Sequence, residues 1–405
     1  MKNVVLVAPY FGENMLHCIR CFAELDVKLG LVTHESEDRV PDELRSSLAG
    51  HYRISNSGDP DQLAAAARAY QKEWGTVDRL EGYLEQLQVP IAQAREACGI
   101  DGMHAEAAKN FRDKNRMKQV LREAGVSVAR QARITGADDA REFVEAVGYP
   151  IVLKPIDGAG ARNTMRAVDD QDLFAALERL LPSEERPVQA EEFVRGEEHT
   201  FEAVTIDGAP VWSSSTYYLP GPLEVLENPW MQYCLLLPRE QQPHVDAFAE
   251  TNRAALTALG MRNGFSHMEW VLTSGGRALV SEVGARPPGA NIMILNGAAH
   301  DVDMWRKWAR LQVEREWDMP ERAYATGCAF LRAQGRGAQV SRIIGLDLVQ
   351  ERIGDAVVQA KLPRVGQTRS SHYEGDGWVV VRHRETRGVV EALRTLVTQL
   401  VIEAR

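Results

Sequence analysis

Hydrophobic runs alternate with amphipathic stretches through the first 105 residues. The pattern predicts strands at 4–8, 27–33 and 77–83 and helices at 15–25, 60–72 and 89–97. Repeated strand–helix units favour a parallel sheet with right-handed crossovers. We therefore expect residues 1–105 to form an α/β domain. Its first turn, Phe11-Gly12-Glu13-Asn14, does not match G-x-G-x-x-G, so a dinucleotide site here is poorly supported.

The pattern changes after residue 105. A helix at 105–124 closed by Gly125, an extended segment at 126–134, a helix at 138–146, a strand at 149–155 and a helix at 170–181 predict a small α+β unit. We expect this unit, at about 115–188, to be a lid on a domain that spans residues 106–315. Strands at 189–193, 200–206 and 209–216, an irregular stretch at 217–236 and a helix at 242–259 follow.

A hairpin and a β-rich tail complete the chain. Residues 266–270 and 279–283 have strand patterns and flank Thr273-Ser274-Gly275-Gly276, which favours a tight turn. Strands at 323–332, 356–361 and 377–383 and a closing helix at 386–402 predict a β-rich C-terminal subdomain over residues 316–405.

The composition narrows the class of protein. The length of 405 residues suggests two to three domains, and 44% hydrophobic and 26% charged residues are typical of a globular protein. A net charge of −10 argues against a nucleic-acid binder that relies on positive charge. No run approaches the roughly 18 apolar residues of a membrane span, so no membrane partner is expected.

The five cysteines are scattered and odd in number, which favours a reducing, cytoplasmic location. Cys18-Ile19-Arg20-Cys21 has the C-x-x-C spacing, but no second pair completes a zinc motif. The simpler interpretation is that both cysteines lie on a helix near the core, and the alternative is that they form a redox pair.

The residues with the clearest chemistry are two glutamates, Glu269 and Glu282, on the two strands of the predicted hairpin. Carboxylates from adjacent strands can hold a hard divalent cation such as Mg²⁺. Lys154 ends an apolar strand and precedes Asp157-Gly158-Ala159-Gly160-Ala161, whose backbone N–H groups could bind an anion. Together with Lys114, these features predict a site for a nucleoside triphosphate. Taken alone, Lys154 would be better explained as a solvated lysine at a strand end, and the glycine-rich loop is not a P-loop.

Five motifs occur in the order typical of ATP-grasp ligases, and the chain resembles that superfamily over nearly its whole length. They are Phe111–Lys114, Lys154–Gly160, Glu191–Glu198, His267–Glu269 and Glu282–Gly289. The Gly284-Ala285-Arg286-Pro287-Pro288-Gly289 ending and the tail look most like the L-amino-acid ligases, which are relatives of biotin carboxylase and D-alanine–D-alanine ligase. The resemblance implies an ATP-grasp fold preceded by a Rossmann-like domain.

The resemblance also implies roles for individual residues. Lys114 and Lys154 would contact ATP phosphates, and the loop of Asp157, Gly158, Ala159 and Gly160 would close over them. Glu191, Glu192, Phe193 and Val194 would form the adenine-binding linker, and Glu198 would accept hydrogen bonds from the ribose. Without the resemblance, these glutamates would fit a charged surface bend equally well. Glu269 and Glu282 would hold two Mg²⁺ ions, with Mn²⁺ as an alternative.

Two further residues are candidates for contact with the reacting groups. Arg286 would hold the reacting carboxylate or its acyl phosphate, because a guanidinium binds two oxygens and stays charged. His267 lies two residues before Glu269 and so on the same strand face, where it would contact phosphate or substrate; a structural histidine is the alternative. Many relatives have asparagine two residues after the second glutamate, where this chain has Gly284, so the third protein ligand of the metal is in question.

These expectations describe an ATP-dependent, ADP-forming carboxylate–amine ligase that makes an amide or peptide bond through an acyl phosphate. Its partners would be a small-molecule carboxylate and an amine, with an amino acid among them, and the resemblance also allows a homodimer. Two alternatives stay open: a carboxylase that activates bicarbonate, and a nucleotide-binding protein without catalytic activity.

Overall fold

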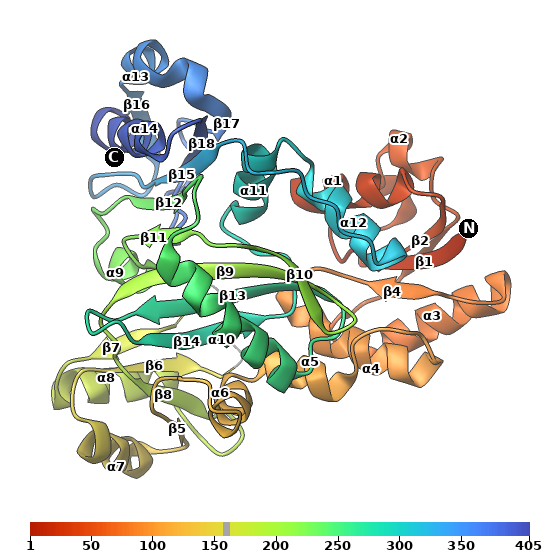
Figure 1. Cartoon of the computed structure of the whole chain (residues 1–405), viewed down its shortest axis with the longest axis horizontal. Helices are drawn as coiled ribbons and strands as arrows, with labels where there is room; N and C mark the ends of the chain where they lie inside the picture. Colours follow the sequence, from red (N-terminus) through yellow and green to blue (C-terminus); the bar gives the residue numbers. More distant parts are fainter. Residues whose placement is uncertain (157–162) are drawn as a thin grey trace.

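The computed structural model describes residues 1–156 and 163–405 of the chain. Figure 1 shows an N-terminal sheet with its helices, a small unit of sheet and helices built from β5 to β8, and a large central sheet between them. The chain ends in a group of helices and strands on the opposite side of the molecule from the N-terminus (Figure 1). The mixture of α/β and α+β parts expected from the sequence is confirmed.

The N-terminal sheet is parallel, as predicted, with strand order β3-β2-β1-β4. Its strands are β1 (Lys2–Val7), β2 (Val27–Thr33), β3 (Gly50–Arg53) and β4 (Arg79–Glu81), and its helices are α1 (Glu13–Ala23), α2 (Asp42–Arg45), α3 (Pro60–Trp74) and α4 (Gln88–Cys98). Val4 to Val7 are fully buried because helices cover both faces of this sheet. The short strand β3 and helix α2 were not predicted from the pattern.

The small unit has a four-stranded antiparallel sheet in the order β5-β8-β6-β7. Its elements are β5 (Gln131–Ile134), α7 (Ala137–Val147), β6 (Ile151–Pro155), β7 (Met165–Ala167), α8 (Asp170–Leu180) and β8 (Val188–Glu192). The two helices pack on the sheet around Ile134, Phe143, Leu153 and Leu173. This arrangement places Lys154 and Glu191 on neighbouring strands.

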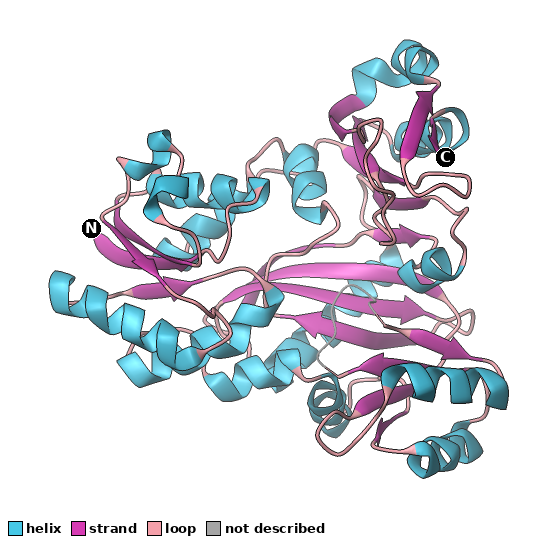
Figure 2. Cartoon of the chain, turned by 180° about the vertical axis from the view of Figure 1, so that it is seen from behind, coloured by secondary structure: helices cyan, strands magenta, loops and turns pink. Residues whose placement is uncertain are grey.

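The central sheet has nine antiparallel strands in the order β14-β13-β9-β11-β12-β15-β18-β17, with β10 paired to β9. Figure 2 shows its long strands in magenta. The strands are β9 (Glu197–Ile206), β10 (Ala209–Ser214), β11 (Tyr217–Leu219), β12 (Tyr233–Leu237), β13 (Gly264–Leu272), β14 (Ala278–Gly284), β15 (Ala325–Leu331), β17 (Val357–Lys361) and β18 (Gly377–His383). Helix α10 (Pro243–Leu259) packs on this sheet, where Phe248 stacks on Trp270 with ring centroids 4.0 Å apart.

The remaining elements connect and cover these sheets. They are α5 (Ala105–Arg112), α6 (Lys114–Glu123), α9 (Pro222–Glu227), α11 (Ile292–His300), α12 (Met304–Glu314), β16 (Val340–Ile344), α13 (Leu346–Ile353), α14 (Thr386–Gln399) and β19 (Val401–Ala404). Strands β16 and β19 pair with each other, whereas β15, β17 and β18 extend the central sheet. Helices α11 and α12 run from the central sheet to α1 (Figure 1).

The structure corrects three local predictions. The single helix expected at 105–124 is two helices, because Asp113 has an extended backbone and its side chain caps α6. The stretch expected to be irregular at 217–236 contains β11, α9 and β12, and its two strands pair with each other. The closing helix ends at Gln399, and Val401–Ala404 pairs with β16 instead of continuing the helix. Helices α11 and α12 were not predicted.

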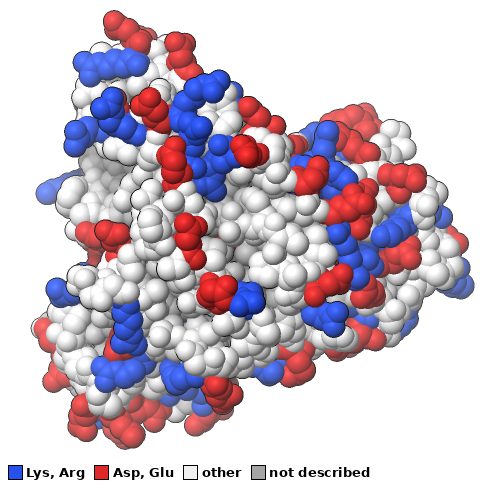
Figure 3. Space-filling view, viewed as in Figure 1, with Lys and Arg blue, Asp and Glu red and all other residues white. Residues whose placement is uncertain are grey.

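Within the described residues, no helix is both long and apolar enough to cross a membrane. Basic and acidic side chains are interspersed over the face of the molecule in Figure 3.

Candidate active site

The predicted site residues converge on one cavity of about 490 Å³ between the small sheet, the central sheet and the N-terminal domain. Every predicted residue that the structure describes lines it: Lys114, Lys154, Glu191, Glu192, Phe193, Val194, Glu198, His267, Glu269, Glu282 and Arg286. The predicted loop residues Asp157, Gly158, Ala159 and Gly160 lie outside the described residues. Segments far apart in the sequence therefore share one concave site, which is the usual form of a small-molecule site.

The two glutamates of the hairpin are direct cross-strand partners. Strands β13 and β14 pair so that Glu269 lies opposite Glu282, with an irregularity in the register just after Glu269. Directly opposite side chains share one face of a sheet, so both carboxylates project into the cavity. The Nζ of Lys114 lies 2.9 Å from Oε1 of Glu282, so this carboxylate already faces a cation.

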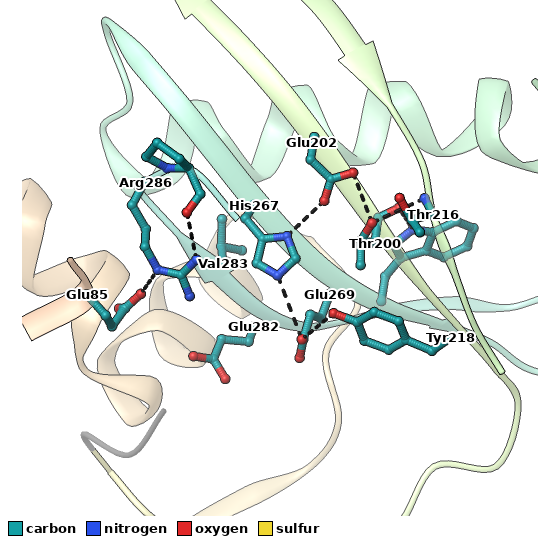
Figure 4. Close-up of polar contacts among 12 residues, drawn as sticks. Glu85, Thr200, Glu202, Thr216, Tyr218, His267, Glu269, Glu282, Val283 and Arg286 are labelled. Atoms are coloured by element: carbon teal, nitrogen blue, oxygen red, sulfur yellow. Dashed lines mark hydrogen bonds and ion pairs between the residues drawn. The ribbon is translucent and has the colours of Figure 1, made fainter. Parts of the chain in front are cut away.

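His267 lies between two carboxylates on the same face (Figure 4). Its Nδ1 lies 2.8 Å from Oε1 of Glu202, and its Nε2 lies 3.8 Å from Oε1 of Glu269. Burial opposes the imidazolium, but the hydrogen bond to Glu202 and the ion-pair contact with Glu269 outweigh it and raise the pKa of His267 to about 9. Tyr218 donates a hydrogen bond of 3.0 Å to the same oxygen of Glu269. The imidazolium and the phenol together hold Glu269 ionised and in one orientation.

A second charge cluster lies at the small sheet. Oε1 of Glu191 is 2.7 Å from Nζ of Lys118 and 2.8 Å from Nζ of Lys154. Burial opposes the Glu191 carboxylate, but the two ammonium groups lower its pKa to about 2. Burial lowers the pKa of Lys118 to about 8. Two lysines thus share one carboxylate, which leaves net positive charge at the cavity wall for an anion.

Arg286 pairs with Glu85, a residue of the N-terminal domain in the short helix Glu85–Leu87. The guanidinium Nε contacts Oε2 of Glu85, and one terminal nitrogen donates a 2.9 Å hydrogen bond to the carbonyl oxygen of Pro287 (Figure 4). A Cβ on Gly284 would lie 3.4 Å from Oε2 of Glu85 and 3.6 Å from Cγ of Arg286. The ion pair between Arg286 and Glu85 therefore occupies part of the space that a side chain larger than glycine would need at position 284.

Glu198 lines the cavity with its carboxyl group packed against Gly221, the N-cap of α9. A Cβ on Gly221 would lie 2.1 Å from Oε1 of Glu198, so only glycine fits there without displacing the carboxyl group. Burial, followed by the nearby carboxylates Glu269 and Glu224, raises the pKa of Glu198 to about 7.

The predicted adenine-binding linker consists of the last two residues of β8, Glu191 and Glu192, and the next two residues, Phe193 and Val194. All four line the cavity. Glu192 accepts hydrogen bonds from Arg130 through both the backbone N–H, at 2.8 Å, and the side-chain Nε, at 2.7 Å. The guanidinium of Arg166, on β7, lies 5.2 Å above the ring of Phe193 and also pairs with Glu227 of α9.

Lys118 and Glu85 are among the cavity residues that sequence reasoning missed. Lys118 is only 1% exposed, but in the sequence it resembles an ordinary polar residue of an amphipathic helix. Glu85 lies in a short connecting segment without a motif. For Lys118 one signal was available, because it follows Lys114 by four residues and therefore lies on the same helix face. Glu85 had no such signal.

Comparisons with known proteins agree with this geometry. Residues 113–199 match the family described as carbamoyl-phosphate synthase L chain, ATP binding domain. The alanine–anticapsin ligase of Bacillus subtilis strain 168 is 34% identical over 119 residues, which are 27% of this chain and 25% of that protein. An L-arginine-specific L-amino acid ligase of Bacillus subtilis is 25% identical over 247 residues, which are 60% of this chain and 59% of that protein.

Among solved structures, an L-amino acid ligase from Bacillus licheniformis superimposes with a TM-score of 0.78 and 20% identity, over 100% of this chain and 99% of that one. The fold is therefore the ATP-grasp fold with an N-terminal parallel-sheet domain. The chain resembles ATP-grasp ligases, with L-amino acid ligases among them. In the first curated relatives, the matching region spans only about a quarter of the length of each protein.

Proposed function

We propose that this protein is an ATP-dependent, ADP-forming ligase that joins a carboxylate to an amine, with an amino acid as a substrate. The observation that carries the proposal is the convergence of Lys118, Lys154, Glu269, Glu282 and Arg286 on one cavity. Phosphate-binding cations, metal-binding carboxylates and a carboxylate-binding guanidinium are the groups that such a reaction requires. Similarity to ligases of this fold supports the same activity.

The nucleotide would lie between the small sheet and the central sheet. Lys114 and Lys154 would bind phosphate oxygens, as the sequence predicts, and Lys118 would lie beside them. Glu191 would keep the ammonium groups of Lys118 and Lys154 in place before the nucleotide arrives. Glu192, Phe193 and Val194 would border the base, and Glu198 would accept hydrogen bonds from the ribose. The proposal for the base and the ribose is supported by the cavity lining, which includes all four of these residues.

Glu269 and Glu282 fit Mg²⁺ by their chemistry. Both offer carboxylate oxygens, the ligands that Mg²⁺ prefers, and the contact between Lys114 and Glu282 supports the proposal because positive charge is favoured beside this carboxylate. When bound, Mg²⁺ would neutralise the charge that develops during phosphoryl transfer. Because Gly284 has no side chain to offer, Glu269 and Glu282 would be the protein ligands of the two ions proposed here.

The reaction would have two steps. First, a carboxylate oxygen held by Arg286 attacks the γ-phosphorus of ATP, the bond to the β-phosphate oxygen breaks, and ADP leaves with an acyl phosphate remaining. An amine nitrogen then attacks the acyl carbon, phosphate leaves with the carbon–oxygen bonding electrons, and the ammonium product loses its proton to water. No protein nucleophile is needed, so positioning and charge stabilisation would provide the catalysis.

A coupled assay of ADP release tests this function. Purified protein with ATP, Mg²⁺ and pairs of amino acids and small acids should release ADP, and mass spectrometry should find a condensation product. Arg286→Lys should lower kcat/KM for the carboxylate, because lysine keeps the charge but not the two-oxygen fork. The matched control is Arg253→Lys, which makes the same substitution at an exposed arginine on α10 and should leave the rate unchanged.

Normal ATP binding without ADP release for any pair would refute the ligase function. ADP release with bicarbonate and no amino acid would assign the protein to bicarbonate activation instead. Nucleotide binding with no turnover under all these conditions would support a non-catalytic protein.

A further inference from the structure

We propose that His17, Cys21 and Asp303 form a zinc site where α1 meets α12, separate from the nucleotide cavity. His17 and Cys21 are four residues apart on α1 and so project from the same face of the helix. Asp303 is the N-cap residue of α12, which packs on α1. None of the three is among the described residues that line the cavity.

Three chemically different metal-binding atoms converge here. Nε2 of His17 lies 2.8 Å from Oδ2 of Asp303, and Sγ of Cys21 lies 3.9 Å from the same nitrogen and 3.8 Å from the same oxygen. Tetrahedral zinc with bonds of about 2.0–2.3 Å would hold such atoms about 3.3–3.6 Å apart. Shifts of about half an ångström would reach that geometry, and imidazole, thiolate and carboxylate are all ordinary zinc ligands.

The surroundings favour a metal at this point. One oxygen of Asp303 accepts hydrogen bonds from the backbone N–H groups of Trp305 and Arg306, at 2.9 and 3.2 Å. These bonds fix the carboxylate with its other oxygen directed toward His17. Cys21 is buried, whereas the side chains of His17 and Asp303 are 43% and 32% exposed, so water can supply a fourth ligand. Zinc would replace the thiol proton of Cys21, which is released to solvent.

The site would link two parts of the chain that are far apart in sequence. Helix α1 belongs to the N-terminal domain, and α12 connects the central sheet to it. Their contact already includes Phe22 and Trp308, which meet edge to face with ring centroids 5.5 Å apart. Zinc bound only by the folded protein would therefore raise its thermal stability, whatever reaction the cavity catalyses.

Cobalt titration tests the site on the full chain, using Co²⁺ as a spectroscopic probe for zinc. Protein treated with a chelator should bind one Co²⁺ with a thiolate-to-metal absorption band that Zn²⁺ abolishes, and Zn²⁺ should raise the unfolding temperature. Cys21→Ser should lose the band and the stabilisation. Cys18→Ser, one turn earlier on the same helix and also buried, should keep both.

Asp303→Asn provides a second test that preserves the fold, because asparagine caps helices as well as aspartate does. It should weaken Co²⁺ binding and remove most of the stabilisation by Zn²⁺. A Co²⁺ spectrum without a thiolate band in the wild-type protein, or one that is unchanged in Cys21→Ser or Asp303→Asn, would overturn the proposal. None of these readouts depends on ligase activity.

Discussion

Glu269 and Glu282 face each other as direct partners across the β13–β14 hairpin. Like charges at such positions are destabilising unless other groups compensate them. Here Lys114 lies 2.9 Å from Glu282, and His267 and Tyr218 contact Glu269. Two neighbouring carboxylates that are each stabilised by a separate polar or charged partner are typical of a functional site. This arrangement supports the proposed role of the pair in holding a metal–nucleotide complex.

Glu282→Gln should lower the rate of ADP release by about 100-fold or more, the scale of losing one preorganised electrostatic contact. Glutamine keeps the shape but not the charge that would hold the metal. Steady-state kinetics with varied Mg²⁺ would measure the effect. Glu250→Gln removes a carboxylate that is 75% exposed on α10 and serves as the matched control. A turnover equal to that of the control would exclude a role in metal activation.

Glu191→Gln should destabilise the protein more than Lys118→Met does. Without the carboxylate, both Lys118 and Lys154 lose their shared buried partner, and loss of a buried counter-charge costs roughly 3–5 kcal/mol. Lys118→Met leaves Glu191 paired with Lys154. Urea unfolding of both variants gives the comparison, and equal stability would show that Glu191 does not organise the two lysines.

Stability should depend on His267 between pH 6.5 and about 9. Its pKa is raised from 6.5 to about 9 in the folded protein, so the folded state binds a proton that the unfolded state loses first. This contribution is fully present below pH 6.5 and is lost as the pH rises through about 9.

His267→Asn removes that dependence. The difference in unfolding free energy between wild type and variant separates the contribution of His267 from those of other groups that titrate in this range, Lys118 and Glu198 among them. A difference that stays constant with pH would show that the histidine is not held as an imidazolium.

Gly221→Ala should weaken nucleotide binding about tenfold, on the scale of one impaired hydrogen bond to a charged group. The new Cβ would lie 2.1 Å from Oε1 of Glu198 and must displace the carboxyl group assigned to the ribose. Gly136→Ala changes another glycine N-cap, on α7, where a Cβ meets nothing within 4 Å. Calorimetry with a non-hydrolysable ATP analogue compares the two variants, and equal affinities would contradict the role of Glu198.

Local patterns were sufficient for the parts of the fold that depend on near neighbours. The turn Thr273–Gly276 between two strand patterns predicted the hairpin, and with it the pairing of Glu269 and Glu282. The alternation of strands and helices predicted the parallel N-terminal sheet. By contrast, the prolines of residues 217–236 led to the expectation of an irregular stretch, although Tyr233–Leu237 is a continuous apolar run. This run pairs with β15, nearly a hundred residues later. That pairing depends on a partner that no local window contains.

The sequence by itself determined which residue types gather at the cavity, because its motifs and strand patterns identify the lysines, glutamates and arginine that line it. The chemistry of these groups suits phosphate, metal and carboxylate ligands. Only the tertiary structure decided their partners. The burial of Lys118 beside Glu191, and the pairing of the partly buried Arg286 with Glu85, depend on contacts between elements distant along the chain. The charge state of a buried group is set by such contacts, and therefore by the packing of the sheets around the cavity.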